Sequence, residues 1–388
     1  MPSPPPTRLL SVFYFCAFIS VGISTPYLSP YLSDLGLSGT EIATVLSLIP
    51  ICNLGVPLAW AWIADRTHRH ALLLRVASFG SALGIAILLT ARHFRGALLA
   101  FAVFALFNTG IGPVVDTLAV ALSVEGRGYG RVRMWGSFGF LVAAAVGGAL
   151  LTARGGRPAD PLVPALMLGG LLSAGLVSFR VHGHVAPRRQ KPHLSDVAAL
   201  WRDRRFRLLL AVASLHWMTL APYNVFFGLL LRTRHLSPAV GGAAFVAGVL
   251  AEGAVMFWFS SLRRVFRLET LLCISFAATV LRWLLVWRVH SAPLMIALQA
   301  VHGLTFGLFW ITGIALLNEL VPPAVRATGQ ALYLMAMLGL GSLVGYHATG
   351  LILDVSHDVG PAFLLAGLVE IIPLAIIWRV RKRDLLRQ

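Results

Sequence analysis

Twelve long apolar segments follow one another along the 388-residue chain, separated by short stretches of charge, proline and glycine. The first six cover residues 9–32, 41–63, 71–91, 97–122, 132–152 and 162–179. The second six cover residues 208–231, 238–262, 268–287, 293–318, 328–353 and 360–378. Each is close to the length of about 20 residues with which an α-helix crosses a bilayer. The pattern predicts an all-α membrane protein with twelve transmembrane helices in two six-helix bundles.

The longest polar stretch lies between the two sets of six segments. It runs from Arg180 to Arg207 and holds eight basic residues. We therefore expect an N-terminal six-helix bundle over residues 1–180 and a cytoplasmic linker over residues 181–207. A C-terminal six-helix bundle with a short basic tail follows over residues 208–388.

The composition is that of a chain that lives in lipid. Hydrophobic residues make up 57% of it and charged residues 12%, and the mean hydropathy is +0.80. These values exclude a water-soluble globular domain of this length. The formal net charge of +17 would suit nucleic acid, but the basic residues lie in short loops and form no continuous basic face. We therefore expect the lipid bilayer, and no nucleic acid, as a partner.

The basic residues also predict the orientation of the chain. With both termini in the cytoplasm, the inner segments carry 23 Lys and Arg residues and the outer loops carry 7. Such an excess is typical of cytoplasmic loops. The pattern indicates a multi-pass protein of a bacterial inner (plasma) membrane with both ends inside, and we expect a monomer.

The pattern contains no recognisable enzyme chemistry. The sequence shows no Ser-His-Asp arrangement, no HExxH motif and no glycine-rich phosphate loop. The histidines are scattered without the spacing of metal ligands, and Cys16, Cys52 and Cys273 lie inside apolar segments without a paired spacing. We predict neither an enzyme nor a metal or cofactor site. Transport would then draw on an ion gradient or on the solute's own gradient.

The loop after the second segment carries a motif. Its residues Ala61-Trp62-Ile63-Ala64-Asp65-Arg66-Thr67-His68-Arg69 resemble the loop signature of the major facilitator superfamily, in which an Asp and several basic residues join helices 2 and 3. Ala61 and His68 replace the two glycines that are usual there. An Asp next to basic residues at a helix end can pair with the end of a neighbouring helix, and this pair can break when the protein opens. The resemblance thus implies a gating role for Asp65, Arg66 and Arg69.

A second resemblance lies at the start of the fifth segment. The run Tyr129-Gly130-Arg131-Val132-Arg133-Met134-Trp135-Gly136-Ser137-Phe138-Gly139-Phe140 is similar to helix 5 of the clade that holds lactose permease, nucleoside-proton symporters and phenylpropionate permeases. Asp116 matches the place of the sugar-binding Glu of lactose permease, and Arg133 matches the Arg that pairs with it. The resemblance implies an Asp116–Arg133 pair at the substrate. The alternative is a purely structural pair between two helices.

The second half resembles the proton site of lactose permease in part. Arg282 and His302 lie 20 residues apart, the spacing of the helix 9 Arg and the helix 10 His in that permease. Thr305 replaces its proton-carrying Glu, so another group must carry the proton. Glu252, in the middle of the eighth segment, is the expected carrier, with Arg282 and His302 as modulators. The alternatives are an Arg282 that snorkels outward and a His302 that only links helices.

Departures from lactose permease bear on the substrate. Tyr223 and Asn224 stand where that permease has acids on helix 7, and Phe140 replaces its sugar-stacking Trp. Two cavity arginines would suit a carboxylate, and the aromatic residues would suit a ring. The expected substrate-binding residues are Asp116, Arg133, Phe140, Tyr223, Asn224 and Arg282. Glu370 is expected to pair structurally, because helix 12 is peripheral in the fold that the chain resembles.

The favoured function is secondary active symport of a small organic solute with a proton, by alternating access between the two bundles. An organic or aromatic acid is favoured as the solute, with a sugar or a nucleoside left open. Proton-coupled efflux of a drug or metabolite is the first alternative, although the fifth segment lacks the proline-glycine pattern of efflux proteins. A non-transporting membrane sensor is a more distant alternative.

Overall fold

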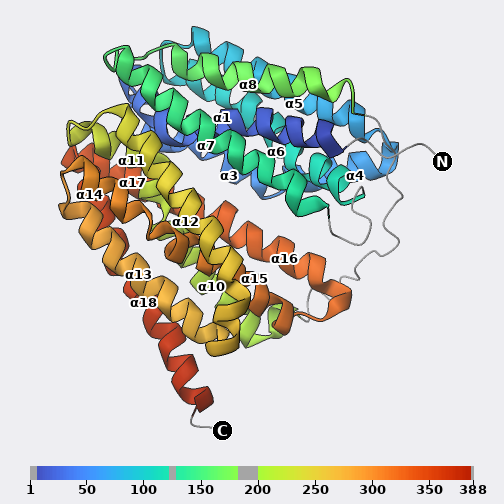
Figure 1. Ribbon diagram of the computed structural model, residues 1–388, viewed down its shortest axis with the longest axis vertical. Helices are drawn as coiled ribbons and strands as arrows, with labels where there is room; N and C mark the ends of the chain where they lie inside the picture. Colours follow the sequence, from blue (N-terminus) through green and yellow to red (C-terminus); the bar gives the residue numbers. More distant parts are fainter. Residues whose placement is uncertain (1–6, 122–127, 182–199, 386–388) are drawn as a thin grey trace. The chain divides into compact units, whose positions relative to one another are not determined.

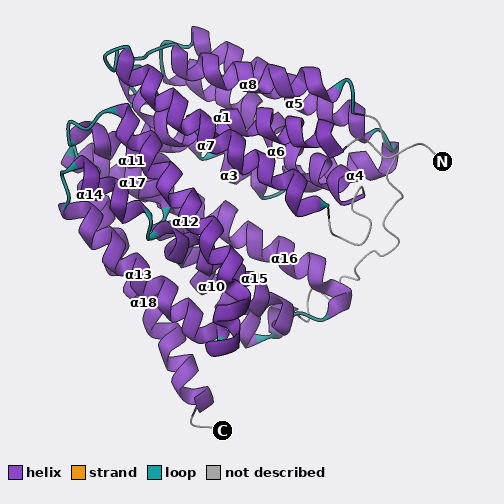
Figure 2. Ribbon diagram, in the orientation of Figure 1, coloured by secondary structure: helices purple, strands orange, loops and turns teal. Residues whose placement is uncertain are grey.

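The computed structural model describes residues 7–121, 128–181 and 200–385, and all regular elements in these ranges are helices (Figure 1, Figure 2). The chain divides into two compact units. The first comprises Met1–Arg189 and Ser237–Ala243, and the second comprises Gln190–Leu236 and Ala244–Gln388. The predicted all-helical architecture is confirmed.

The described residues of the first unit form eight whole helices, and the first residues of α12 (Pro238–Val265) also belong to this unit. The eight are α1 (Thr7–Asp34), α2 (Gly39–Leu46), α3 (Leu48–Asn53), α4 (Val56–Thr67), α5 (His70–Thr90), α6 (Phe94–Ala121), α7 (Tyr129–Ala153) and α8 (Leu162–Ser178). The second apolar segment is therefore broken, with a bend of 42° between its two parts. Gly55 lies at the break and Pro57 follows it in the first turn of α4. A glycine and a proline together interrupt the hydrogen bonds that would continue one helix.

In the first unit, α1 packs against α7 and α8, and α5 packs against α6 and α8 (Figure 1). Glycines allow the closest approach. A Cβ added at Gly22 of α1 would lie 2.5 Å from the carbonyl oxygen of Phe140, and one added at Gly139 of α7 would overlap the carbonyl oxygen of Phe15. Small residues at such crossings are how membrane helices reach close contact.

The loop between α7 and α8 is held by Asp160. Its carboxylate accepts a hydrogen bond from the Leu162 N–H at 2.9 Å and pairs with Arg154 Nε at 2.7 Å. Burial raises the pKa of Asp160, but the hydrogen bonds from Arg154 and Leu162 outweigh it and hold the pKa below its ordinary value. The acid thus caps the start of α8 and joins it to the end of α7.

The second unit holds α10 to α18 and two π-helical segments. Its elements are α10 (Arg204–Thr219), α11 (Ala221–Thr233), α12 (Pro238–Val265), α13 (Leu268–Arg288), α14 (Ala292–Gln299), η2 (Gly303–Leu308), α15 (Phe309–Leu320), η3 (Pro323–Val325), α16 (Arg326–Leu334), η4 (Met335–Gly341), α17 (Ser342–Ser356) and α18 (Gly360–Leu385). η2 and η4 are π-helical, η3 is a 3₁₀ turn, and π-helical turns inside longer helices are frequent at functional sites.

The start of α10 differs from the prediction. The helix begins at Arg204, inside the stretch expected to be a linker, because the carboxylate of Asp203 caps it by accepting the Arg205 N–H at 2.7 Å. Residues 182–199 of the predicted linker lie outside the described residues.

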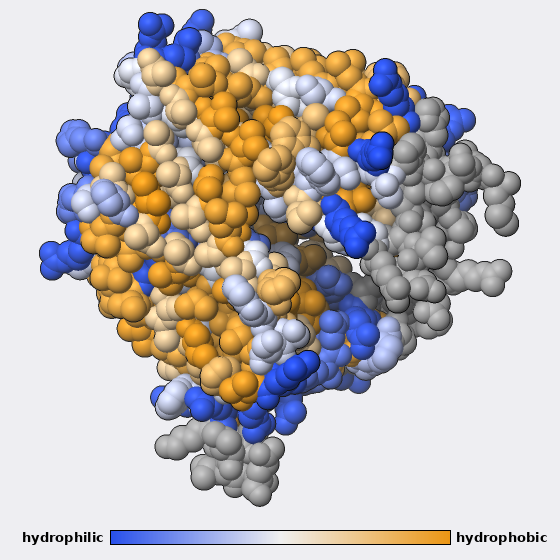
Figure 3. Space-filling view, in the orientation of Figure 1, coloured by the Kyte–Doolittle hydropathy of each residue, from blue (hydrophilic) through white to orange (hydrophobic). Residues whose placement is uncertain are grey.

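Among the described residues, ten helical spans are long and apolar enough to cross a bilayer. Three of them join consecutive elements: Arg204–Thr233, Ala292–Leu320 and Thr328–Ser356. The bent pair Gly39–Asn53 and Val56–Thr67 makes an eleventh candidate. Large apolar side chains remain exposed on these spans, such as Phe257, which is 79% exposed, and Trp378, which is 55% exposed. Apolar side chains also cover much of the face seen in Figure 3. Such surfaces are stable against hydrocarbon and costly in water.

The Gly139 crossing can be tested by adding one methyl group. We expect Gly139→Ala to destabilise the protein by roughly 1 to 3 kcal/mol, because the new Cβ meets a backbone atom that cannot rotate away. The matched control is Gly169→Ala on α8, where an added Cβ has no neighbour within 4 Å. Thermal unfolding in detergent measures both variants. Equal melting temperatures for the two would contradict this packing.

Candidate functional site

In the first unit, polar side chains from three helices meet around Tyr14. The buried hydroxyl of Tyr14 on α1 donates a hydrogen bond to Asp116 Oδ1 on α6. The guanidinium of Arg133 on α7 lies over the ring of Tyr14 at 5.6 Å and over the ring of Phe18 at 4.4 Å. Tyr129, the first residue of α7, is within electrostatic reach of both charges. The site therefore holds an acid, a base and a face of aromatic rings.

The predicted contact between Asp116 and Arg133 takes a different form. These two described side chains do not form an ion pair within 4.0 Å, because Tyr14 stands between them and binds one charge by its hydroxyl and the other by its ring. The prediction named the acid and the base but did not include Tyr14, which contacts both. A tyrosine within the apolar run of α1 was the available signal, since a buried phenol hydroxyl needs a partner.

The other residue of this half predicted to bind substrate is Phe140. It lies half-buried on α7, two helical turns after Arg133, and its carbonyl oxygen faces Gly22 of α1. Its backbone therefore takes part in the α1–α7 crossing.

The predicted gating residues lie at the end of α4 and just beyond it. Asp65, Arg66 and Arg69 are all exposed, and Arg66 lies over the ring of Trp62 at 5.5 Å. His68, at a position where the family has glycine, adopts a left-handed backbone with φ 55° and ends the helix. The loop therefore keeps the turn that glycine usually provides, at a steric cost. The gating role stays a prediction.

In the second unit, the guanidinium of Arg282 on α13 is completely buried. Its Nη1 donates to Thr305 Oγ1 at 2.7 Å and lies 3.1 Å from His302 Nδ1, and its Nη2 donates to Gln299 Oε1. The cation also lies over the ring of Tyr223 at 4.4 Å. Arg282 thus points into the bundle and does not snorkel outward.

The hydrogen-bond partners of Arg282 among the described residues are all neutral. A guanidinium only donates, so His302 Nδ1 must accept and the imidazole proton must sit on Nε2. While this contact holds, His302 orients Arg282 and does not take up a proton on Nδ1. The site therefore contains a buried positive charge whose hydrogen-bond partners supply dipoles and no full negative charge, which is costly.

An aromatic ladder continues from this cation. The ring of His302 stacks on Phe306 at 4.9 Å, and Phe306 stacks on Trp310 at 5.8 Å. Trp217 of α10 contacts both rings, at 5.6 and 5.8 Å. Since Phe306 and Trp310 are only half-buried, the ladder offers ring faces to a planar ligand.

Glu252 lies half-buried on α12, against the π-helical segment η2. A Cβ added at Gly307 would come within 3.1 Å of Glu252 Cγ, and one added at Gly248 would come within 3.3 Å of both His302 and the Tyr223 hydroxyl oxygen. Glu252 is also within electrostatic reach of Tyr223. Glu252 is thus near the ring that lies under Arg282, and its role as proton carrier stays a prediction. Asn224 is half-buried on α11, and its side chain makes no hydrogen bond among the described residues.

A buried pair that sequence reasoning did not assign lies on α10 and α18. His216 Nδ1 is 2.6 Å from Glu370 Oε1, and His216 Nε2 is 2.9 Å from the carbonyl oxygen of Thr305. The hydroxyl of Thr219 contacts Glu370 Oε2. Glu370 does pair with a neighbouring helix as expected, but in the interior of the unit. Histidine and glutamate in the middle of apolar helices were the signal for this pair.

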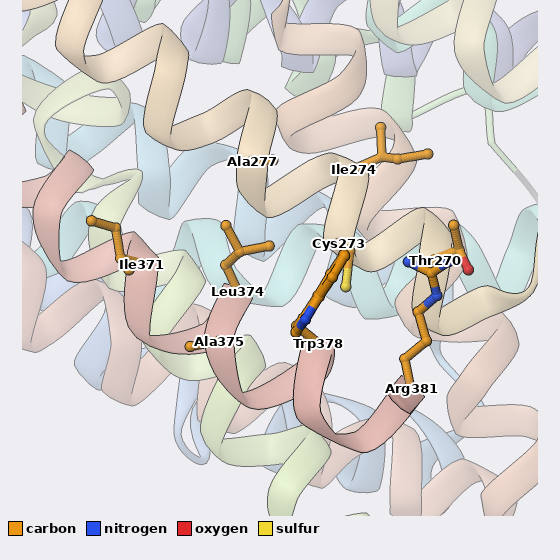
Figure 4. Close-up of a pocket in the computed structure, with 9 residues that line it drawn as sticks. All are labelled: Thr270, Cys273, Ile274, Ala277, Ile371, Leu374, Ala375, Trp378 and Arg381. Carbon is orange, nitrogen blue, oxygen red and sulfur yellow. The ribbon is translucent and has the colours of Figure 1, made fainter. Parts of the chain in front are cut away.

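A separate cavity of about 490 Å³ lies between α13 and α18. Figure 4 shows Cys273 and Ile274 on one wall and Leu374 and Trp378 on the other, with Arg381 at one end. It contains none of the predicted site residues and is otherwise lined almost wholly by apolar side chains.

Known proteins match the chain over most of its length. The MFS_1 like family matches residues 7–364. A maltose permease from Geobacillus stearothermophilus is 27% identical over 385 residues, which cover 96% of this chain and 94% of that protein. A probable 3-phenylpropionic acid transporter from Escherichia coli (strain K12) is 28% identical over 305 residues, 77% of this chain and 79% of that protein. The crystal structure of the nucleoside transporter NupG superposes with a TM-score of 0.83 at 17% identity, covering 97% of this chain and 99% of that one.

Proposed function

Because the chain belongs to the MFS_1 like family, a family of membrane transporters, we propose that it is a proton-coupled symporter of a small organic anion that works by alternating access. The observation that supports an anion is the buried Arg282, whose described partners are all neutral. An anionic solute would supply the missing negative charge. Uptake and not efflux is proposed because the run from Tyr129 to Phe140 is similar to uptake permeases.

A carboxylate fits this site better than other anions. The guanidinium presents a planar fork that matches two carboxylate oxygens, and the half-buried rings of Phe306 and Trp310 lie along the same ladder as His302. An aryl carboxylate would use both features. The similarity to a probable 3-phenylpropionic acid transporter agrees with this class of solute. A sugar is the second candidate, since a maltose permease is similar over nearly the whole chain.

Glu252 is the proposed carrier of the coupled proton. It lies on α12 beside η2, which carries Thr305, and it is half-buried at the edge of the Arg282 site. A carboxyl group there can be neutral when Arg282 is engaged elsewhere and ionised when the cation approaches. Substrate binding to Arg282 and proton binding to Glu252 would then depend on each other.

The proposal includes twelve spans with both termini in the cytoplasm. The twelfth span is α8, an apolar helix of 17 residues, a length at the lower limit of about 17 residues for crossing a bilayer. The gating role of Asp65, Arg66 and Arg69 and the substrate role of Asp116 and Arg133 belong to the same proposal.

The substrate proposal is tested by removing the cation. We expect Arg282→Gln to weaken binding of 3-phenylpropionate at least ~10-fold, because a charge-assisted hydrogen-bond pair is lost. Isothermal titration of the purified protein measures this. The control is Arg288→Gln, an exposed arginine on the same helix that lies over Trp287, and its affinity should match the parent. Unchanged affinity in Arg282→Gln would exclude Arg282 from the binding site.

The coupling proposal is tested with Glu252→Gln. This variant should lose uphill accumulation in proteoliposomes under an imposed pH step and keep counterflow, because exchange needs no net proton release. Glu319→Gln is the control, since Glu319 is exposed and paired with Arg263. Accumulation at the parent rate in Glu252→Gln would remove Glu252 from coupling and direct attention to Asp116.

The orientation is tested by cysteine labelling in a variant that lacks the three native cysteines. A cysteine at Arg264, in the predicted inner loop, should react with a membrane-impermeant reagent only after the cells are opened. A cysteine at Arg157, in the predicted outer loop, should react in intact cells. The reverse result would overturn the topology.

A further inference from the structure

His216 and Glu370 form a completely buried pair that the proposed transport mechanism does not use. The imidazole lies between the rings of Phe309, at 4.1 Å, and Phe276, at 5.2 Å. Both members of the pair are 0% exposed. Any charge on this pair must therefore be balanced within the pair or by its immediate neighbours.

The hydrogen-bond geometry determines how many protons the pair holds. The carbonyl oxygen of Thr305 can only accept, so His216 Nε2, 2.9 Å away, must carry a proton. Nδ1 and Glu370 Oε1, 2.6 Å apart, then need one further proton between them. It sits on the imidazole, which makes an ion pair, or on the carboxyl, which makes a neutral pair. Without it, two lone pairs would face each other in a dry site.

We propose that His216 and Glu370 form a proton-binding site, and that its proton latches α10 and α18 to the π-helical segment η2. When the proton leaves, the pair carries one negative charge. The imidazole keeps a single proton, which the ionised carboxylate draws to Nδ1. Nε2 then presents a lone pair to the Thr305 carbonyl, and the bond between α10 and η2 is lost.

The latch reaches the Arg282 site through a single residue. Thr305 accepts from His216 at its carbonyl oxygen and from Arg282 at its hydroxyl oxygen, at 2.7 Å. Because Thr305 lies within the six-residue π-helical segment Gly303–Leu308, release of its carbonyl frees the segment that also holds the hydroxyl in place. Occupancy of the buried proton site therefore controls how Arg282 is held.

Few other charges face the pair. Among the described residues, α13 contributes Arg282 and Cys273, α11 contributes Tyr223, α16 contributes Tyr333, and α17 contributes Tyr346 and His347. His302 precedes η2 and Glu252 lies against it. His347 Nδ1 lies 2.9 Å from the Leu343 carbonyl oxygen. The segment η4 has no ionisable residue, and the remaining charged side chains of α10, α11, α13, α15, α16 and α17 lie in the first or last turns of those helices. Arg379 on α18 is nine residues beyond Glu370.

Hydrogen–deuterium exchange of the substrate-free protein in lipid nanodiscs tests the latch. Exchange rates of residues 303–308 are corrected for the intrinsic effect of pH. In the parent, protection of this segment should be high at low pH and fall about fivefold or more as pH rises. A change of about fivefold in an equilibrium constant is what the loss of one hydrogen bond is expected to cause. Constant protection from acidic to alkaline pH in the parent would overturn the proposal.

Two variants separate the pair from other titrating groups. In Glu370→Gln the amide N–H donates to Nδ1 and holds His216 in the latched tautomer, so protection should stay high at every pH. In His216→Leu the side chain has no N–H to donate to the Thr305 carbonyl, so protection should be low at every pH. This variant tests the latch even if Glu370→Gln does not fold. Glu269→Gln on α13, whose acid pairs with Arg267, is the control and should behave as the parent. A parental pH response in both pair variants would refute the latch.

These measurements need neither substrate nor transport. Failure of Arg282 to bind an anion, or of Glu252 to couple, would leave the expected exchange results unchanged. Conversely, exchange protection of η2 that does not change with pH would refute the latch and leave the transport proposal in place.

Discussion

The second unit is organised around one costly group, the buried guanidinium of Arg282. A cation removed from water needs acceptors for its N–H groups and electron density near its face. Gln299, His302 and Thr305 supply the acceptors, and the ring of Tyr223 supplies the face. None of these groups carries a full negative charge. Arg282 Nε and the Tyr223 hydroxyl are left without a hydrogen-bond partner among the described residues. The proposed anion would bring negative charge and further acceptors to this site.

The π-helical segment η2 connects this cation to the rest of the unit. Its Thr305 bonds to Arg282 on one side and to His216 on the other, and its Gly307 makes room for Glu252 of α12. Titratable side chains from α10 and α12 therefore lie against one short, irregular stretch of backbone, and Glu370 of α18 is linked to it through His216. Backbone hydrogen bonds in such a stretch are less regular than in an α-helix. In our proposal, protonation of the His216–Glu370 pair therefore changes the conformation of η2.

Periodicity and length were enough to predict an all-helical protein and the ten described spans that are long enough to cross a bilayer, because a bilayer requires about the same apolar length of every span. They did not predict the break around Gly55, where α3 and α4 divide one apolar segment. A glycine and a proline are tolerated inside many membrane helices, so their presence alone does not decide between a kink and a break. The early start of α10 was missed for a similar reason. Its cap depends on the single hydrogen bond that Asp203 accepts.

The candidate site was predictable where the resemblance to lactose permease supplied the spacing between Arg282 and His302. Arg282 and His302 do contact each other, and Glu252 lies against Gly307 of η2. The partners that were missed depend on contacts between residues far apart in the chain. Tyr14 and Asp116 are separated by 102 residues, and His216 and Glu370 by 154. A single sequence indicates that a buried polar group needs a partner, but only the packing of the helices shows which one it has.

The claim on which the rest depends is that the Arg282 site takes up a negative charge. Thermal stabilisation by a matched pair of ligands tests it most directly: 3-phenylpropionate and its neutral amide, which share the ring and the chain length and differ in charge. A ligand that binds only the folded protein raises the melting temperature, and at equal concentration a tighter ligand raises it more. The acid should stabilise the protein and the amide at equal concentration should not. Equal stabilisation by both, or stabilisation by maltose alone, would contradict an anion site at Arg282.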